Sequence, residues 1–224
     1  MNKNSEYWDK KLPKNAEEST YIPWLEEKKL VLPRNKSEMI LDLGCGNGED
    51  TAWLLQNGYQ VISVDYSDYA VEKVNQINPD NTFLFDMADA DAWKQFPDNY
   101  FSIVVANLTL HYFDEKTTNL ILKQIKRILK PNGKLIARVN SFDDKAFGAS
   151  DGEMIEDGYF SNPERGINKR FFTLGSANQY FSKIGYVAVC PKTINYIGKQ
   201  KKIVEVVAQK EPAKIFEETL IQPE

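Results

Sequence analysis

A glycine-rich turn and a series of acidic or amide residues are the parts of this sequence best suited to binding a small ligand. The turn is Gly44-Cys-Gly-Asn-Gly48, directly after the apolar run 39–43. Glycine lets the backbone turn sharply and pass close to a ligand. Three later apolar runs end at Asp65, Asp86 and Asn107. Asp65 follows Gly44 by about 20 residues, a spacing at which a strand-end carboxylate can accept hydrogen bonds from ribose hydroxyls.

The charges around the turn distinguish two nucleotide cofactors. A dinucleotide site follows the pattern Gly-x-Gly-x-x-Gly and places a pyrophosphate at the helix N-terminus. Here Glu49 stands at the position of the third glycine, Asp50 follows it, and Asp42 precedes the turn. These carboxylates would repel a pyrophosphate, whereas S-adenosylmethionine has no phosphate and carries a sulfonium and an ammonium cation. The sequence therefore favours S-adenosylmethionine, and a nicotinamide-dependent oxidoreductase is an alternative.

The elements that must position these residues alternate between strands and helices. Apolar runs predict strands at 39–43, 60–64, 83–85, 101–106 and 134–139, with helices after Gly48, Ser67 and Asp114. Ser67 and Asp114 are residue types that cap a first helical turn. Near-continuous apolar strands alternating with helices predict a parallel sheet that is covered on both faces. Ligands bind beyond the carboxyl ends of such strands, which is where the glycine turn and the polar residues lie.

The rest of the chain predicts accessory segments around one domain at 37–210. Residues 1–36 contain Pro13, Pro23 and Pro33 and predict helical pieces that form a lid. Residues 143–172 are charged and show no clear period, which predicts a cap or insertion over the site. A helix near 176–183 and an antiparallel hairpin of strands at 186–193 and 202–209 are expected to close the sheet. Residues 211–224 predict a surface helix or a tail.

Composition limits the class of protein. The chain has 224 residues with 28 Lys and Arg against 32 Asp and Glu, one histidine and two cysteines, too few for a zinc site of the usual spacing. We therefore expect no metal, and the acidic balance without a basic, aromatic-rich extension argues against a nucleic acid partner. No apolar run approaches the ~20 residues of a membrane span, and the first residues lack the apolar core of a signal peptide. We expect a cytoplasmic protein, either a monomer or a homodimer, with no membrane association.

Four segments resemble the class I S-adenosylmethionine-dependent methyltransferases, and they occur in the order typical of that family. They are the segments 40–48, 64–67, 97–105 and 129–135. The resemblance implies an α/β fold: a Rossmann-like, doubly wound, seven-stranded and mainly parallel sheet with an antiparallel last strand and helices on both faces. Among these enzymes the chain is similar to the tellurite-resistance and thiopurine type, which implies a small-molecule acceptor. The implied activity is transfer of a methyl group from S-adenosylmethionine, giving S-adenosylhomocysteine, by in-line displacement.

The resemblance also assigns cofactor contacts. It implies that the glycines face the methionine end and the ribose, that Asp42 supports the amino group and that Asp65 binds the ribose hydroxyls. It places Tyr66 over the adenine and Asp86 at the adenine amino group. The implied cofactor-binding set is Asp42, Gly44, Cys45, Gly46, Gly48, Asp65, Tyr66, Ser67, Asp86, Met87, Ala88, Asn107 and Leu108. Cys45 is expected to fill the turn as a small residue rather than to act as a nucleophile, and Asp86 has an alternative role as a cap for residues from Ala88 onward.

The acceptor side of the site is less well defined by the sequence. His111 and Asn107 are the candidate catalytic residues, although a lone histidine is usually packed, and a base is needed only when the acceptor must lose a proton before attack. Asn-Leu-Thr-Leu at 107–110 replaces the Asn/Asp-Pro-Pro-Tyr of many amino-group methyltransferases, which argues against adenine or glutamine amide as acceptor. The candidate acceptor contacts, of which Arg138 and Asn140 are expected to face the cap, are Tyr7, Trp8, Arg138, Asn140, Tyr159 and Arg170. A non-catalytic S-adenosylmethionine-binding or regulatory domain is the second alternative.

Overall fold

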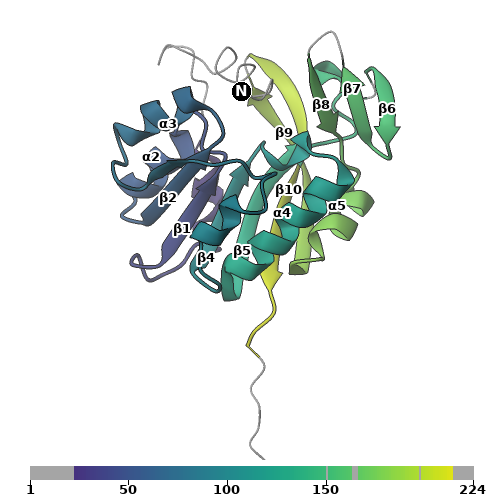
Figure 1. Ribbon diagram of the computed structural model, residues 1–224. Coiled ribbons are helices and arrows are strands. Elements are labelled where there is room, and N and C mark those ends of the chain that lie inside the picture. The colour runs from purple at the N-terminus through teal and green to yellow at the C-terminus, as the bar shows by residue number, and fades with distance from the viewer. Residues whose placement is uncertain (1–22, 150, 163–165, 197, 214–224) are drawn as a thin grey trace, which may run out of the picture.

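The apolar runs form the central layer of the structure, a computed structural model that describes residues 23–149, 151–162, 166–196 and 198–213. Seven strands make one sheet in the spatial order β3-β2-β1-β4-β5-β10-β9 (Figure 1). Neighbours among β1 to β5 pair in parallel, and β10 pairs antiparallel with both β5 and β9. The predicted mainly parallel sheet with an antiparallel last strand is confirmed. Its strands are β1 (Met39–Leu43), β2 (Gln60–Asp65), β3 (Thr82–Leu84), β4 (Phe101–Asn107), β5 (Leu129–Asn140), β9 (Gly185–Tyr196) and β10 (Lys199–Lys210).

Helices cover both faces of this sheet, as the alternation of elements predicts. The α-helices are α2 (Glu49–Gln56), α3 (Asp68–Asn75), α4 (Glu115–Ile128) and α5 (Leu174–Phe181). One core cluster joins α4 and α5 to strand residues such as Val104. The other joins α2 and the short helix η2 (Trp24–Lys28) to residues such as Val105. Successive residues of β4 thus enter opposite cores, because side chains alternate along a strand.

Two predicted helix starts are confirmed by their hydrogen bonds. The Ser67 hydroxyl accepts a hydrogen bond from the backbone N–H of Ala70 at 3.2 Å, and the Asp114 carboxylate accepts one from Thr117 at 2.7 Å. Each bond satisfies an N–H that has no partner within its own helix. The two caps therefore fix where α3 and α4 begin relative to the strand ends before them.

The stretch 143–172 is more regular than predicted. It contains a second, three-stranded antiparallel sheet of β6 (Glu153–Glu156), β7 (Tyr159–Asn162) and β8 (Ile167–Arg170), in the order β6-β7-β8. Figure 1 shows this small sheet beside the end of β9, above α5. The sequence shows no clear period over the whole stretch because each of these strands is only four residues long. We call residues 143–172 the cap.

Other corrections concern the bounds of strands. β5 begins at Leu129, before the predicted residue 134, and continues through Asn132, whose φ of 64° is left-handed. Pro131 and Gly133 lie in this bend, which is why the sequence predicts a helix end there and not a strand. β9 and β10 are both longer than predicted.

The predicted lid at 1–36 and tail at 211–224 fall largely outside the described residues, so the division into segments stays a prediction. Within the described part, Trp24 and Leu25 of η2 are buried in the core beside α2. No helix in the described ranges combines the length and apolar character needed to span a membrane.

Candidate functional site

The glycine turn is a closely packed loop between β1 and α2. Gly44, Gly46 and Gly48 all have left-handed φ angles, of 80°, 52° and 81°. A Cβ atom on Gly44 would lie 2.5 Å from the Oγ1 atom of Thr109, and one on Gly48 would lie 2.7 Å from a methyl group of Val74. A side chain at either position would therefore force the turn away from its neighbours. Thr109, which the sequence did not single out, brings the segment after β4 against the turn.

Asp65, at the end of β2, is held by two backbone groups. The N–H of Gly46 donates to one carboxylate oxygen and the N–H of Ser67 donates to the other, each at 2.9 Å. Each carboxylate oxygen has a second lone pair. The two bonds therefore fix the plane of the carboxylate at the end of β2.

Two further carboxylates, Asp42 and Asp50, lie buried next to the turn, with exposed fractions of 1% and 6%. The Thr51 hydroxyl donates to Asp42 at 2.6 Å. Burial, followed by the negative charges of Asp50 and Asp65, raises the pKa of Asp42 to about 8. A bound cation would relieve this repulsion, and a phosphate would increase it. The residues present therefore fit S-adenosylmethionine, and they argue against a dinucleotide.

On the side predicted for adenine, Tyr66 and Asp86 lie near each other. Burial and the charge of Asp86 raise the pKa of Tyr66, whose hydroxyl has no hydrogen-bond partner among the described residues. Asp86 accepts a hydrogen bond from the N–H of Ala88 at 2.9 Å, within a turn and not at a helix start. Met87 is buried, and its carbonyl accepts a bond from the indole of Trp93. Ala88 is exposed.

The end of β4 combines backbone strain with an unpaired polar atom. Leu108 has a φ of 56°, a left-handed conformation that a leucine seldom adopts and that recurs at functional sites. The amide nitrogen of Asn107 donates to Asp50 at 2.9 Å. The Asn107 Oδ1 atom is buried without a partner in the described part of the chain. The strand end thus places an amide oxygen next to the acidic residues.

Cys45 and His111 are both buried and uncharged. Burial and the charges of Asp42 and Asp65 raise the pKa of the Cys45 thiol, which makes it a poor nucleophile. His111 is 1% exposed, and burial with the charges of Lys201 and Lys169 lowers its pKa well below 6.5. Its Nδ1 atom has no hydrogen-bond partner among the described residues. His111 is therefore a neutral imidazole near pH 7 and a weak base.

Arg138 does not face the cap, and this is a correction. Its guanidinium makes two hydrogen bonds to Glu205 of β10, at 3.0 and 2.8 Å, and lies 4.3 Å from the ring centre of Trp24. Alternation along β5 puts Arg138 on the face of Ile136, which belongs to the core beside α2 and η2. Asn140 is on this same face by alternation; it is 1% exposed, with an Oδ1 atom that has no partner among the described residues.

Tyr159 and Arg170 make contacts within the cap and to the short helix η4 (Leu110–Tyr112). The Tyr159 hydroxyl donates to the carbonyl of Tyr112 at 3.2 Å. Arg170 is 2% exposed and donates to Glu156 at 2.6 Å and to the carbonyl of Asp157 at 2.7 Å. Both side chains thus hold the cap together and against η4. Tyr7 and Trp8 lie outside the described residues.

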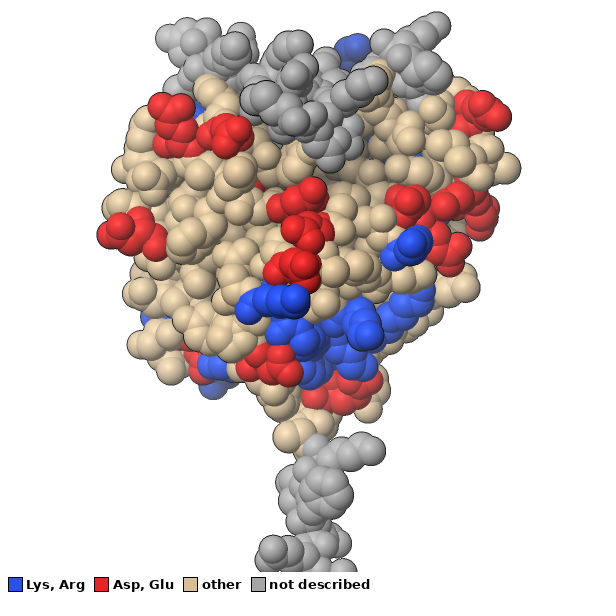
Figure 2. Space-filling model, in the orientation of Figure 1, with Lys and Arg blue, Asp and Glu red and all other residues tan. Residues whose placement is uncertain are grey.

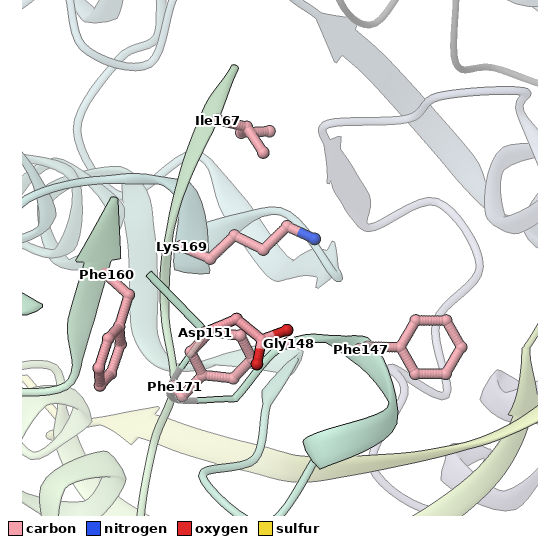
Figure 3. Close-up of a pocket in the computed structure, with 7 residues that line it drawn as sticks. All are labelled: Phe147, Gly148, Asp151, Phe160, Ile167, Lys169 and Phe171. Carbon is pink, nitrogen blue, oxygen red and sulfur yellow. The ribbon is translucent and has the colours of Figure 1, made fainter. Parts of the chain in front are cut away.

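A small hollow in the cap is the feature that the sequence prediction missed on the acceptor side (Figure 3). Ile167, Lys169 and Phe171 line it at alternate positions on and after β8. This alternation of every second residue is the sequence signal that could have predicted strand β8 and its lining of the hollow. Lys169 also connects the hollow to His111, whose pKa its charge lowers. The residues that line the hollow are Phe147, Gly148, Asp151, Phe160, Ile167, Lys169 and Phe171.

Comparison with known proteins agrees with this geometry. Residues 41–137, from β1 into β5, match the family model described as "Methyltransferase domain". Residues 41–137 thus carry a methyltransferase domain, consistent with the class I S-adenosylmethionine-dependent family that the sequence resembles. The resemblance noted in the sequence is thereby confirmed for this methyltransferase domain.

Individual relatives share the domain and differ in what they act on. The 27-O-demethylrifamycin SV methyltransferase of Amycolatopsis mediterranei is 29% identical over 134 residues, which are 58% of this chain and 47% of that protein. The tRNA N(3)-cytidine methyltransferase METTL2 of Danio rerio is 26% identical over 160 residues, 66% of this chain and 45% of that protein. The chain thus spans about half the length of these curated relatives.

The solved structures support the fold over a longer stretch. A methyltransferase from Methanosarcina mazei described as S-adenosylmethionine-dependent superposes with a TM-score of 0.69 at 21% identity, covering 86% of this chain and 99% of that one. The superposition therefore extends beyond residues 41–137 and shows that the fold is shared by most of the chain.

Proposed function

We propose that this chain transfers a methyl group from S-adenosylmethionine to a small-molecule acceptor by in-line displacement. The observation that carries the proposal is the pairing of a glycine turn, locked by the Asp65 carboxylate, with the buried acidic residues Asp42 and Asp50. A cationic cofactor with a ribose satisfies both features. When bound, S-adenosylmethionine supplies a methyl group on a positively charged sulfur, which leaves as a neutral thioether.

The residues of this chain orient the reactants rather than activate them chemically. In the proposed arrangement Asp65 accepts the ribose hydroxyls, the backbone of the turn faces the methionine end, and Tyr66 and Asp86 contact the adenine. Met87 and Ala88 continue that wall, and Asn107 with Leu108 lies nearest the methyl group. In-line displacement on an activated carbon depends chiefly on alignment and on exclusion of water.

The acceptor is proposed to be a molecule that is already nucleophilic, such as a thiolate or an amine. His111 is the one histidine of the sequence, and its lowered pKa makes it a weak general base. The cap, with its aromatic hollow next to η4, is the proposed cover of the acceptor. Phe160 and Phe171 supply apolar lining there, and Lys169 supplies a positive charge.

A small acceptor is favoured over a nucleic acid by the surface charges. In the face shown in Figure 2, Lys and Arg side chains gather at the lower end, where α4 finishes with Lys126 and Arg127. Lys126 pairs with Glu211, Arg127 with Asp98, and Lys130 with Glu38. These carboxylates offset the positive charge that would attract a phosphate backbone. A cytoplasmic location, and a monomeric or homodimeric state, remain part of the proposal.

Two measurements test the proposed function. Calorimetric titration with S-adenosylmethionine, S-adenosylhomocysteine and NADH should show binding of the first two and none of the third. Turnover of cofactor with a labelled methyl group should then be followed against a panel of metabolites, total tRNA and a protein extract. Label in a small product supports the proposal, and label in tRNA or protein refutes the acceptor class. Tight binding with no transfer to any of them indicates the non-catalytic alternative.

A further inference from the structure

Trp24 and Asp50, neither of which belongs to the predicted site, form a buried bridge to the end of β4. The indole N–H of Trp24 donates to one oxygen of Asp50 at 2.8 Å, and the amide nitrogen of Asn107 donates to the other at 2.9 Å. Trp24 and Asp50 are 2% and 6% exposed. The bridge joins η2, α2 and β4, three elements that are far apart in the sequence.

The bridge fixes the orientation of the Asn107 side-chain amide, that is, which of its oxygen and nitrogen atoms faces Asp50. A carboxylate oxygen accepts hydrogen bonds, and Asp50 accepts one from Trp24 and one from Asn107. Asn107 must therefore turn its NH2 group toward Asp50, which directs Oδ1 the other way. The Oδ1 atom is buried and has no partner among the described residues, an arrangement that is unfavourable until a donor arrives.

The surroundings of Asn107 indicate which donor that is. Asn107 ends β4 next to β1, and Thr109, two residues later, packs against Gly44 of the turn. The raised pKa of Asp42, about 8, shows that this region disfavours added negative charge, and a cation there would favour the ionised form of Asp42. An ammonium group supplies both a positive charge and an N–H donor.

Trp24 is itself held on its other side. Its ring lies against the Arg138 guanidinium, which is bound to Glu205 of β10. The indole therefore has little freedom to follow a moving Asp50, and the chain of contacts runs from β10 through η2 to the strand end.

We infer that Trp24 and Asp50 are positioning residues, which hold the Asn107 amide so that Oδ1 accepts a hydrogen bond from the α-ammonium group of the bound cofactor. The inference rests on the proposed function, because that function supplies the cofactor. It adds two residues that do not touch the reactants and assigns the Asn107 side chain to the methionine end.

The test uses calorimetric titration to compare S-adenosylhomocysteine with 5′-methylthioadenosine, which lacks the amino-acid end that carries the ammonium group and the carboxylate. Asp50→Asn keeps an oxygen for the Trp24 indole but presents an NH2 group to Asn107, so the Asn107 amide should turn round. We expect about tenfold weaker binding of S-adenosylhomocysteine, a change of less than twofold for 5′-methylthioadenosine, and little change in melting temperature, because both hydrogen bonds of the bridge survive.

Three further variants test the role of the acceptor oxygen, and Asn107→Ala separates it from the charge of Asp50. Asn107→Ala keeps the Asp50 charge and removes the oxygen, and it should match the loss of Asp50→Asn. The double variant Asp50→Asn with Asn107→Asp restores an acceptor oxygen and should return to within about threefold of the unaltered protein. Glu72→Gln, at an exposed carboxylate of α3, is the charge control and should change nothing.

The inference is overturned if Asn107→Ala binds S-adenosylhomocysteine normally, or if Asp50→Asn weakens both probes equally. Failure of the unaltered protein to bind either probe would instead refute the proposed function.

Discussion

The strand ends of β1 to β4 and the cap use their polar residues in different ways. At the strand ends, backbone groups orient Asp65, and an oxygen of Asn107 has no partner among the described residues. In the cap, Arg170 bonds to Glu156 and Asp157, and Tyr159 bonds to η4. The first region thus contains a buried polar atom that no described residue satisfies, whereas the polar residues of the cap bond within the cap and to η4.

This difference shows that charge alone does not identify a binding residue. Arg138 and Arg170 are the positively charged candidates of the sequence, and both are bound to carboxylates of the same chain. The acidic residues at the turn lie close to one another, so that an added cation stabilises them. An arginine that is already paired with a carboxylate of its own chain offers less to a substrate than Asp42, whose ionised form is disfavoured until a cation binds.

Gly44→Ala should have the largest effect at the strand ends. The new methyl group would overlap Thr109, and we expect at least about a hundredfold loss of affinity for S-adenosylhomocysteine, measured by titration. The overlap costs about 1–3 kcal/mol of packing free energy, and an alanine in the left-handed conformation costs roughly 1–2 kcal/mol more. Gly58→Ala is the matched control, because Gly58 has the same φ of 80° and its Cβ would meet no atom of the described residues within 4 Å. It should lose stability and keep its affinity.

Asp65→Ala should weaken cofactor binding by about ten- to a hundredfold. Two hydrogen bonds from ribose hydroxyls to a charged acceptor would be lost, each worth about 1.5–3 kcal/mol, and water entering the space of the missing carboxylate would recover part of this. Asp65→Asn should lose a similar amount, because its NH2 group would face the backbone N–H of Gly46 or of Ser67, which are both donors. Unchanged affinity in Asp65→Ala would contradict the contrast between a receptive strand end and a self-bound cap.

Arg170→Met should affect the cap without affecting the cofactor. Its bonds to Glu156 and to the Asp157 carbonyl disappear, and because Glu156 is 34% exposed we expect a loss of only about 1–3 kcal/mol in unfolding free energy. Affinity for S-adenosylhomocysteine should stay within about twofold. Lys94→Met, in a pair whose members are more than three-quarters exposed, is the control and should leave the melting temperature unchanged. Lost affinity at normal stability would place Arg170 in the site.

His111→Gln should have the smallest effect on turnover, a few-fold decrease at most. The turnover of the unaltered protein, plotted against pH, should show no inflection near pH 6.5. Its influence should instead appear in stability. The folded imidazole resists protonation and the unfolded one does not, so the protein should lose stability as pH falls below about 6.5. Denaturant unfolding between pH 5 and 8 checks this, since His111→Gln should lack that part of the decline. A hundredfold fall in turnover with normal cofactor affinity would identify His111 as the base.

The main sheet and the strand-end residues were predictable because each rests on a local pattern. Apolar runs gave β1, β2 and β4, and single cap residues gave the starts of α3 and α4. The contacts between elements were not predictable in this way. The bonds of Trp24 and Asn107 to Asp50 join residues 26 and 57 positions apart, and no local pattern encodes such a distance.

The strands within the cap were not predicted, for a related reason. Four-residue strands give a period of two little room to appear, and Glu156 and Arg170 look like solvent-facing charges until their pairing brings them together. Similarly, Arg138 shares one face of β5 with Ile136. The sequence does not show that η2 packs on that face, so it could not tell which way Arg138 points.

The position of β10 has a consequence for synthesis of the protein. β10 lies inside the sheet, and residues 203–209 pair with residues 140–134 of β5, which are translated more than 60 residues earlier. At about 5–20 residues per second, the β5 edge is without its partner for roughly 3–15 s. A nascent chain interrupted before Lys199 therefore exposes an apolar strand edge that can pair with other chains, so slow translation or early termination should favour aggregation over release of a shortened enzyme.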